Sequence, residues 1–144
     1  MRAFFRRAFY SHEICVLALV ALIGTLGMLP ADLDAKSRDS DASRMQARKI
    51  GFPSNQSDSL KPPADRVDWS YFKLTEKARV SLTVEFSKAE VGGRVVLTSA
   101  TGRELAASSQ SGSKASLSAS LAPGIYYVSV SASKAASYTL SVRE

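Results

Sequence analysis

Residues 67–144 are organised as short segments in which apolar and polar side chains alternate. In one of them Val80, Leu82 and Val84 fall on one side of a strand, because successive side chains of a strand point to opposite faces. This period of two recurs in seven segments, which are 67–74, 79–86, 93–99, 103–108, 114–121, 125–131 and 137–143. No helical period lies between them, so the pattern favours a protein built from strands.

Turn-forming sequences separate these segments. They are Gly92-Gly93, Thr101-Gly102, Ser111-Gly112-Ser113 and Pro123-Gly124. Many short strands joined by such turns are typical of an antiparallel sandwich or barrel. We therefore predict an all-β fold for residues 67–144, a small antiparallel β-sandwich of about seven strands. A domain of this length has a small core.

Three aromatic side chains are expected on outward-facing positions of this sandwich. Phe72 and Leu74 belong to the core by their parity, so Trp69 and Tyr71 point to the opposite face of the same strand, and Tyr127 points outward from its own strand. Large aromatic groups on an exposed sheet face offer the flat, amphipathic contact area that a polymer-binding face uses. These three are the candidate binding residues. In the alternative interpretation Trp69 covers the sheet edge, and the two tyrosines form a stabilising cross-strand pair.

Residues 1–31 have the pattern of an export leader. Arg2, Arg6 and Arg7 precede an apolar run over residues 14–29, and a basic region before an apolar core is typical of a secretory signal. The run is slightly short for a spanning helix. We expect a hydrophobic N-terminal helix that is either a cleaved signal peptide or an uncleaved membrane anchor. In both cases the following chain is exported, to the periplasm or the exterior.

Two further interpretations of the leader have less support. Arg6-Arg7 resembles part of a twin-arginine signal, but Phe5 replaces the usual Ser or Thr. Cys15 is the only cysteine in the chain. It opens the apolar run instead of closing it, so it does not indicate a lipoprotein.

Residues 32–66 are predicted to be a polar, flexible linker. The segment is rich in Asp, Ser and Pro, and it has too few apolar side chains to offset the entropy of ordering. Residues 42–50 match about two turns of helix, with Asp41 as N-cap and Gly51 past the end. An isolated helix of that length is marginal in water.

The net charge of +6 is spread along the chain and forms no basic run in residues 67–144. Nucleic-acid binders concentrate Lys and Arg in a patch or stripe, so we expect no nucleic-acid partner. With one cysteine, an intrachain disulfide is impossible.

The composition of the predicted sandwich argues against an enzyme. The only histidine is His12, in the leader, so the many serines have no histidine base. Calcium needs several clustered oxygen ligands. The candidates are scattered along the sequence, namely Asp65, Asp68, Glu85 and Glu90. We expect no cofactor and no metal site, and a calcium site has only weak support.

The sequence over residues 66–144 resembles the bacterial pre-peptidase C-terminal (PPC) domain, a small β-sandwich. The resemblance rests on the stretches 68–74, 95–106, 121–130 and 138–142, and its most specific piece is Pro-Gly-x-Tyr-Tyr-Val-x-Val at 123–130. It implies a non-catalytic domain of the kind appended to secreted hydrolases, most often peptidases. Some relatives resemble collagen- or polysaccharide-binding modules, and some bind calcium. This chain departs from the pattern because it carries no peptidase, and the strand at 93–97 lacks a frequent acidic residue.

The sequence thus leads to two functional hypotheses. The first is an exported, non-catalytic binding domain that recognises a surface polymer, either a polysaccharide or a fibrous protein, or an envelope protein. The second is a membrane-tethered structural or accessory protein of an envelope or secretion complex that binds no polymer.

Overall fold

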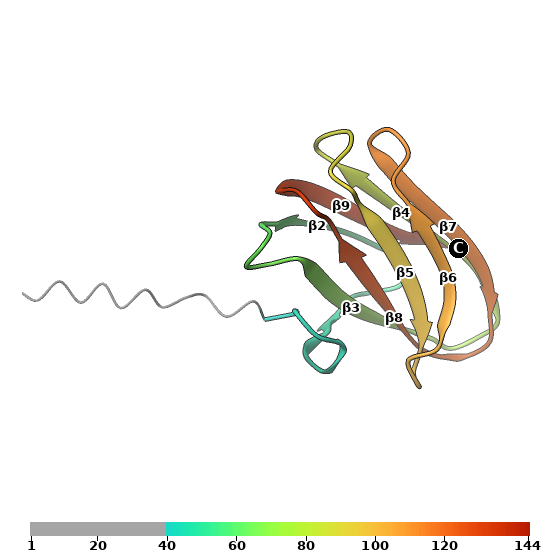
Figure 1. Ribbon diagram of the computed structural model, residues 1–144. Coiled ribbons are helices and arrows are strands. Elements are labelled where there is room, and N and C mark those ends of the chain that lie inside the picture. The colour runs from blue at the N-terminus through green and yellow to red at the C-terminus, as the bar shows by residue number, and fades with distance from the viewer. Residues whose placement is uncertain (1–39) are drawn as a thin grey trace, which may run out of the picture. The chain divides into compact units, whose positions relative to one another are not determined.

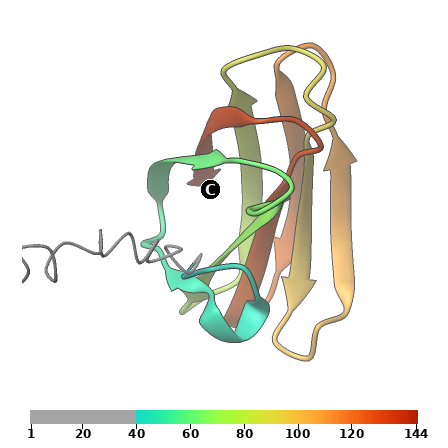
Figure 2. The ribbon, with the colours of Figure 1, turned by 60° about the vertical axis from the view of Figure 1, so that its left-hand side comes forward.

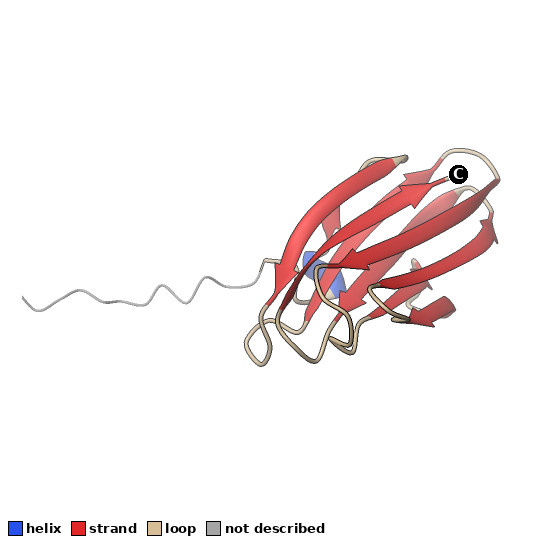
Figure 3. Ribbon diagram, turned by 90° about the horizontal axis from the view of Figure 1, so that it is seen from above, coloured by secondary structure: helices blue, strands red, loops and turns tan. Residues whose placement is uncertain are grey.

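Two β-sheets pack face to face (Figures 1 and 2). The structure, a computed structural model, describes residues 40–144, which contain nine strands and one short 3-10 turn, η1 (Arg44–Gln46). The first sheet consists, in spatial order, of β1 (Arg48–Lys49), β3 (Val67–Leu74), β8 (Gly124–Ser131), β5 (Arg94–Ser99) and β6 (Glu104–Ser109). The second consists of β2 (Ser54–Leu60), β9 (Ala136–Arg143), β4 (Ala78–Phe86) and β7 (Lys114–Leu121). The predicted all-β sandwich is confirmed, and Figure 3 shows strands and loops around the single helical turn.

Neighbouring strands are antiparallel except for β1 and β3, which run parallel. The β3–β8 pair extends from Val67 opposite Ser131 to Leu74 opposite Gly124. The pair β1–β3 joins only Arg48 to Ser70 and Lys49 to Tyr71. The seven segments predicted from the alternation agree with β3 to β9 to within one residue at each end.

The core lies between the sheets and is built mainly from the inward faces of β3, β4, β5, β7, β8 and β9. On β4 the even-numbered residues from Ala78 to Phe86 are buried, and the intervening ones are exposed or half-buried. The largest fully buried side chains are Phe72, Leu60, Leu82, Leu97, Leu140, Val80, Val84, Val91, Val95, Val128, Val130 and Val142. Each such burial stabilises the fold by roughly 1.5–3 kcal/mol before the entropy of ordering is subtracted.

Residues 40–66 differ from the sequence expectation of a flexible linker. The segment carries η1, β1 and β2, and it belongs to the same compact unit as the rest of the sandwich, Arg38–Glu144. The helix expected over 42–50 is reduced to the three residues of η1, and Ser43 takes the N-cap position in place of Asp41. The remainder of the predicted linker, residues 32–39, lies outside the described residues.

Strand β2 forms because β9 supplies a complete pairing partner. Its seven residues pair with β9 from Ser54 opposite Val142 to Leu60 opposite Ala136. Leu60 is fully buried, so the strand also contributes to the core. The entropic cost that was expected to keep this segment disordered is therefore offset by a hydrogen-bonded ladder and an apolar anchor.

Among residues 40–144, none of the helical structure is long or apolar enough to cross a membrane. The leader at 1–31, with its alternatives of cleaved signal and retained anchor, lies outside the described residues.

Candidate functional site

The structure brings Trp69, Tyr71 and Tyr127 onto one outward face of the first sheet. Tyr71 on β3 lies directly opposite Tyr127 on β8, and their ring centroids are 5.8 Å apart with the planes tilted by 40°. Trp69 lies two residues along β3, opposite Ser129. All three aromatic side chains are half-buried. The cross-strand tyrosine pair of the alternative interpretation is thus present, and Trp69 adjoins it.

This aromatic face, which we define as Trp69, Tyr71 and Tyr127, continues onto β5. Val96 lies opposite Ser129, and Thr98 lies opposite Tyr127. Although Thr98 and Ser129 are on the outward side of the sheet, only 6% and 7% of their surfaces are exposed. The hydroxyl of Thr98 donates a hydrogen bond to the backbone carbonyl of Tyr127 at 3.4 Å. The small polar side chains therefore lie beneath a surface formed by their larger neighbours.

An N-terminal strap, residues 40–50, lies against the aromatic face. The guanidinium carbon of Arg44 is 5.5 Å from the centroid of the Tyr127 ring, a cation–π geometry. One guanidinium nitrogen of Arg44 also donates to the carbonyl of Ala100 at 3.2 Å. The placement of η1 beside β3 can be followed in Figures 1 and 2. Part of the face predicted for a ligand is thus occupied by the chain itself.

Backbone hydrogen bonds fasten both ends of the strap to β3. The amide of Trp69 donates to the carbonyl of Asp41 at 2.8 Å, and the amide of Ile50 donates to the carbonyl of Tyr71 at 2.9 Å. Ile50 is buried, which adds an apolar contact to this attachment. Sequence reasoning missed the strap because neither two residues of β1 nor a three-residue turn produces a periodic signal.

The outward face of the second sheet is covered mainly by hydroxyl side chains. We call it the hydroxyl face and define it as Asn55, Ser57 and Ser59 of β2, Ser137, Thr139, Ser141 and Arg143 of β9, Arg79, Ser81, Thr83 and Glu85 of β4, and Lys114, Ser116, Ser118 and Ser120 of β7. Neighbouring hydroxyls on adjacent strands interact, as Ser57 does with Thr139 at 3.1 Å and Ser116 with Thr83 at 3.4 Å. The face is flat and polar, and it carries no aromatic side chain.

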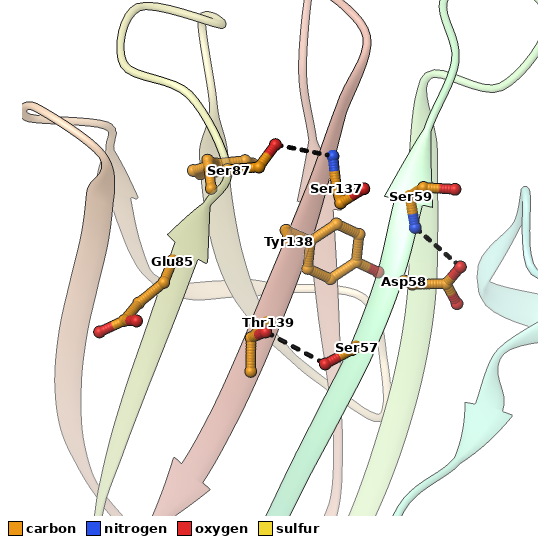
Figure 4. A pocket seen from close by; sticks show the side chains of 9 residues that line it. Ser57, Asp58, Ser59, Glu85, Ser87, Ser137, Tyr138 and Thr139 are labelled. Carbon is orange, nitrogen blue, oxygen red and sulfur yellow. Dashed lines mark hydrogen bonds between the residues drawn. The ribbon is translucent and has the colours of Figure 1, made fainter.

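A shallow groove of about 580 Å³ lies at one end of the hydroxyl face (Figure 4). Hydroxyls of β2, β9 and the end of β4 surround it, and the hydroxyl of Ser87 accepts a hydrogen bond from the amide of Ser137 at 3.2 Å. Glu85 at its rim is paired with Lys114, with the Nζ and Oε1 atoms 2.7 Å apart. Such a groove offers hydrogen-bonding groups for a hydroxyl-rich ligand.

Asp68 and Tyr138 form a buried polar pair between the two sheets. They are 3% and 4% exposed, and the Tyr138 hydroxyl donates to Oδ2 of Asp68 at 2.6 Å. Burial raises the pKa of Asp68 to about 7, and the charges of Asp41, Asp65 and Asp58 add to the rise, while the hydrogen bond from Tyr138 opposes it. Burial, with the bond to Asp68, raises the pKa of Tyr138 far above its usual value.

The acidic residues considered for calcium lie in different parts of the fold. Asp65 lies before β3 and Asp68 is near its start, whereas Glu85 is on the outer face of the second sheet and Glu90 is in the β4–β5 loop. Within residues 40–144, no group of three or more His, Cys, Asp or Glu side chains is arranged to hold a metal ion.

Comparison with known proteins identifies the fold. The pre-peptidase C-terminal domain of a collagenase from Bacillus anthracis superposes with a TM-score of 0.61 at 23% identity, and the match covers 67% of this chain and 93% of that domain. The fold is that of a PPC domain. No protein-family profile matches the sequence, and no curated protein matches it significantly.

More distant similarities to other solved structures accompany this PPC-like fold. A periplasmic inhibitor of g-type lysozyme from Aeromonas hydrophila, PliG, aligns with a TM-score of 0.44 and 12% identity, covering 67% of this chain and 95% of the inhibitor. A CBM35 module from Cellvibrio japonicus aligns with a TM-score of 0.38 and 13% identity, covering 61% of this chain and 96% of the module. These similarities concern only the general sandwich architecture.

Proposed function

We propose that this chain is an exported, non-catalytic binding protein whose sandwich recognises a surface polymer, or an envelope protein, through the aromatic face. The observation that carries the proposal is the convergence of Trp69, Tyr71 and Tyr127 on one half-exposed surface of β3 and β8. Three adjacent aromatic rings provide a platform on which a sugar ring or an apolar side chain can stack. The PPC-like fold supports the proposal, because the two sheets of the sandwich present broad outward faces on which a ligand can lie.

The N-terminal strap sets a condition on this binding. Arg44 lies over the Tyr127 ring, so a ligand that stacks on Tyr127 competes with the cation. Trp69 and Tyr71 are the rings that a polymer contacts first, and Tyr127 becomes available when Arg44 moves aside.

The test is retention of the full-length protein, kept soluble in a non-ionic detergent, on insoluble cellulose, chitin, peptidoglycan and collagen. We expect retention on at least one of these, with about a tenfold or greater loss of affinity in Trp69→Ala and in Tyr71→Ala. Arg44→Ala is expected to increase retention. Glu76→Ala, in the exposed turn between β3 and β4, is the control and should behave as the wild type. If no material retained either the wild type or Arg44→Ala, the binding proposal would be wrong.

The strap favours a second candidate function. Because residues 40–50 occupy part of the aromatic face and attach to β3, the aromatic cluster also serves to hold the segment that follows the leader. A tethered accessory protein of an envelope or secretion complex needs such an attachment and no polymer site. The intact mass of the protein recovered from its native envelope separates the two: a retained leader together with no polymer retention supports the accessory function.

A further inference from the structure

Two arginines of the hydroxyl face occupy diagonal positions on the neighbouring strands β4 and β9. Arg143 on β9 is directly opposite Ser81 on β4, and Arg79 is two residues before Ser81 on the same face of β4. Side chains in this diagonal relation are separated by about 7–8 Å at the backbone. Both arginines are exposed, and neither takes part in an ion pair within residues 40–144.

The surroundings of this arginine pair carry hydroxyls and little negative charge. Ser118 lies opposite Ser81, and Ser120 lies opposite Arg79. The only carboxylate of the hydroxyl face is Glu85, which lies six residues after Arg79 on β4. It is already paired with Lys114 of β7. The nearest remaining acid is Glu144, which follows Arg143 beyond the end of β9.

We propose that this end of the hydroxyl face binds an anionic polysaccharide, a glycan chain that carries carboxylate or sulfate groups. The pair Arg79 and Arg143 binds one such group, because guanidinium groups form paired, charge-assisted hydrogen bonds with planar oxyanions. Ser81, Ser118 and Ser120 hydrogen-bond the hydroxyls of the neighbouring sugars. This site is on the opposite sheet from the aromatic face and does not depend on it.

The charges and hydroxyl groups of this face fit a glycan better than other anionic polymers. Two like charges on neighbouring strands that take part in no ion pair favour binding of an anion, which reduces their mutual repulsion. A single-stranded nucleic acid would need aromatic rings for base stacking, and the hydroxyl face has none. Serine hydroxyls both donate and accept hydrogen bonds, as the hydroxyls of a sugar require.

The geometry also provides a path for a chain longer than one sugar. The hollow beside Arg143, about 490 Å³, is lined by Pro53, by Ser54 and Asn55 of β2, and by the acid Glu144. Across the same face, at the other end of β4, lies the groove of about 580 Å³ that contains Ser137 and Thr139. A glycan anchored at the arginines therefore has, beyond its charged group, a hydroxyl-lined groove on the same surface.

The experiment measures binding of the full-length protein in non-ionic detergent to immobilised polygalacturonate, dextran sulfate and neutral dextran. The wild type is expected to bind at least one anionic polymer and not neutral dextran, more weakly as salt rises. Preference for polygalacturonate or for dextran sulfate identifies the charged group as carboxylate or sulfate. In the double variant Arg79→Gln/Arg143→Gln we expect affinity to fall about tenfold or more. The control double variant Arg66→Gln/Arg103→Gln removes the same charge from exposed positions elsewhere and should lose less than about threefold.

Several outcomes would overturn this proposal. One is equal loss of affinity in both double variants, since that would reflect net charge alone. Another is failure of the wild type to bind either anionic polymer, or equal binding to neutral dextran. A single-stranded oligodeoxynucleotide that bound more tightly than both polymers would replace the glycan with a nucleic acid. The variant Ser81→Ala/Ser118→Ala separates the hydroxyls from the charges: we expect about threefold weaker binding, and unchanged affinity would remove the serines from the site.

Discussion

The hydroxyl of Tyr138 on β9 donates a 2.6 Å hydrogen bond to Oδ2 of Asp68 on β3, and this bond joins the two sheets inside the core. A buried carboxyl group without such a partner would be strongly destabilising. Here it is accommodated because burial, with three aspartates nearby, keeps it protonated up to about pH 7. Arg48, whose Nη2 atom is 2.9 Å from Oδ2 of Asp58, supplies positive charge close to this region.

The raised pKa of Asp68 makes stability depend on pH. The folded chain holds the proton up to about pH 7, whereas the unfolded chain, with the ordinary value of 3.8, has lost it. The free energy of unfolding contributed by Asp68 therefore falls as the pH rises between about 4 and 7, and it changes little above that range. From pH 5 to pH 8 we expect Asp68 to lower the free energy of unfolding by on the order of 2 kcal/mol, measured by urea denaturation.

The variant Asp68→Asn isolates this effect from the other titrating groups. Asparagine stays neutral at every pH and can still accept the hydrogen bond from Tyr138, so the decline from pH 5 to pH 8 should be smaller than in the wild type. Parallel decline in the two proteins would show that Asp68 does not titrate in this range. Tyr138→Phe is expected to lower stability by about 1–2 kcal/mol by leaving the carboxyl group without its partner.

Strand β2 is expected to be essential for the stability of the sandwich. Its anchor, Leu60, is fully buried against the core, so Leu60→Ala should lower the free energy of unfolding by about 2–5 kcal/mol in urea denaturation. Met45 is 97% exposed, and Met45→Ala should change stability by less than about 0.5 kcal/mol. A fragment that began at residue 66 would lack β2 altogether. It would leave the edge of β9 unpaired and should not form a stable sandwich. A cooperative unfolding transition of wild-type stability in that fragment would contradict this role.

The close approach of Gly93 to Phe86 predicts a steric requirement for glycine. A Cβ atom at position 93 would lie 2.3 Å from Cε2 of Phe86, so Gly93→Ala should destabilise the protein by roughly 1–3 kcal/mol. Gly51→Ala is the matched control, since its Cβ would meet only the carbonyl oxygen of Pro53 at 3.4 Å. The double variant Gly93→Ala/Phe86→Leu should recover part of the loss caused by Gly93→Ala alone. If the stability loss of the double variant equalled the sum of the losses of the two single variants, the Phe86 ring would not be the source of the strain.

The single tryptophan of the chain, Trp69, reports on the N-terminal strap. Because its amide is bonded to Asp41 and the strap is held further on by Arg44, Arg44→Ala should loosen the strap and increase acrylamide quenching of Trp69 fluorescence. Urea denaturation should show a loss of only about 0.5–2 kcal/mol, since the cation–π contact and one hydrogen bond are removed. Unchanged quenching would mean that Arg44 does not hold the strap in place.

The alternation of side chains was sufficient to predict the strands from β3 to β9, because all of them except β6 have an apolar inward face. Phe72 and Leu74, assigned to the core by parity, are 0% and 3% exposed. In β2 the inward positions Ser54, Gln56 and Asp58 are polar, and the strand exists because β9 pairs with it. Pairing between segments so far apart in the chain leaves no trace in local sequence.

The candidate sites also depend on pairing between distant segments, which the local sequence does not reveal. Parity placed Trp69, Tyr71 and Tyr127 on outward faces, but only the register of β3 against β8 brings them together. The partnership of Asp68 with Tyr138, 70 residues later, had no sequence signal. The arginine pair of the hydroxyl face likewise depends on the register of β9 against β4.

The shortness of β1 determines how the protein responds to a pull on its N-terminus. Tension applied through the residues before the strap reaches the two-residue pairing of β1 with β3 before it reaches the seven-residue pairing of β2 with β9. The strap therefore yields at a low force, while the β2–β9 pairing still holds. The contacts of Asp41 with Trp69 and of Arg44 with Tyr127 precede β1 and break before it. Mechanical load therefore exposes the aromatic rings while the sandwich stays folded.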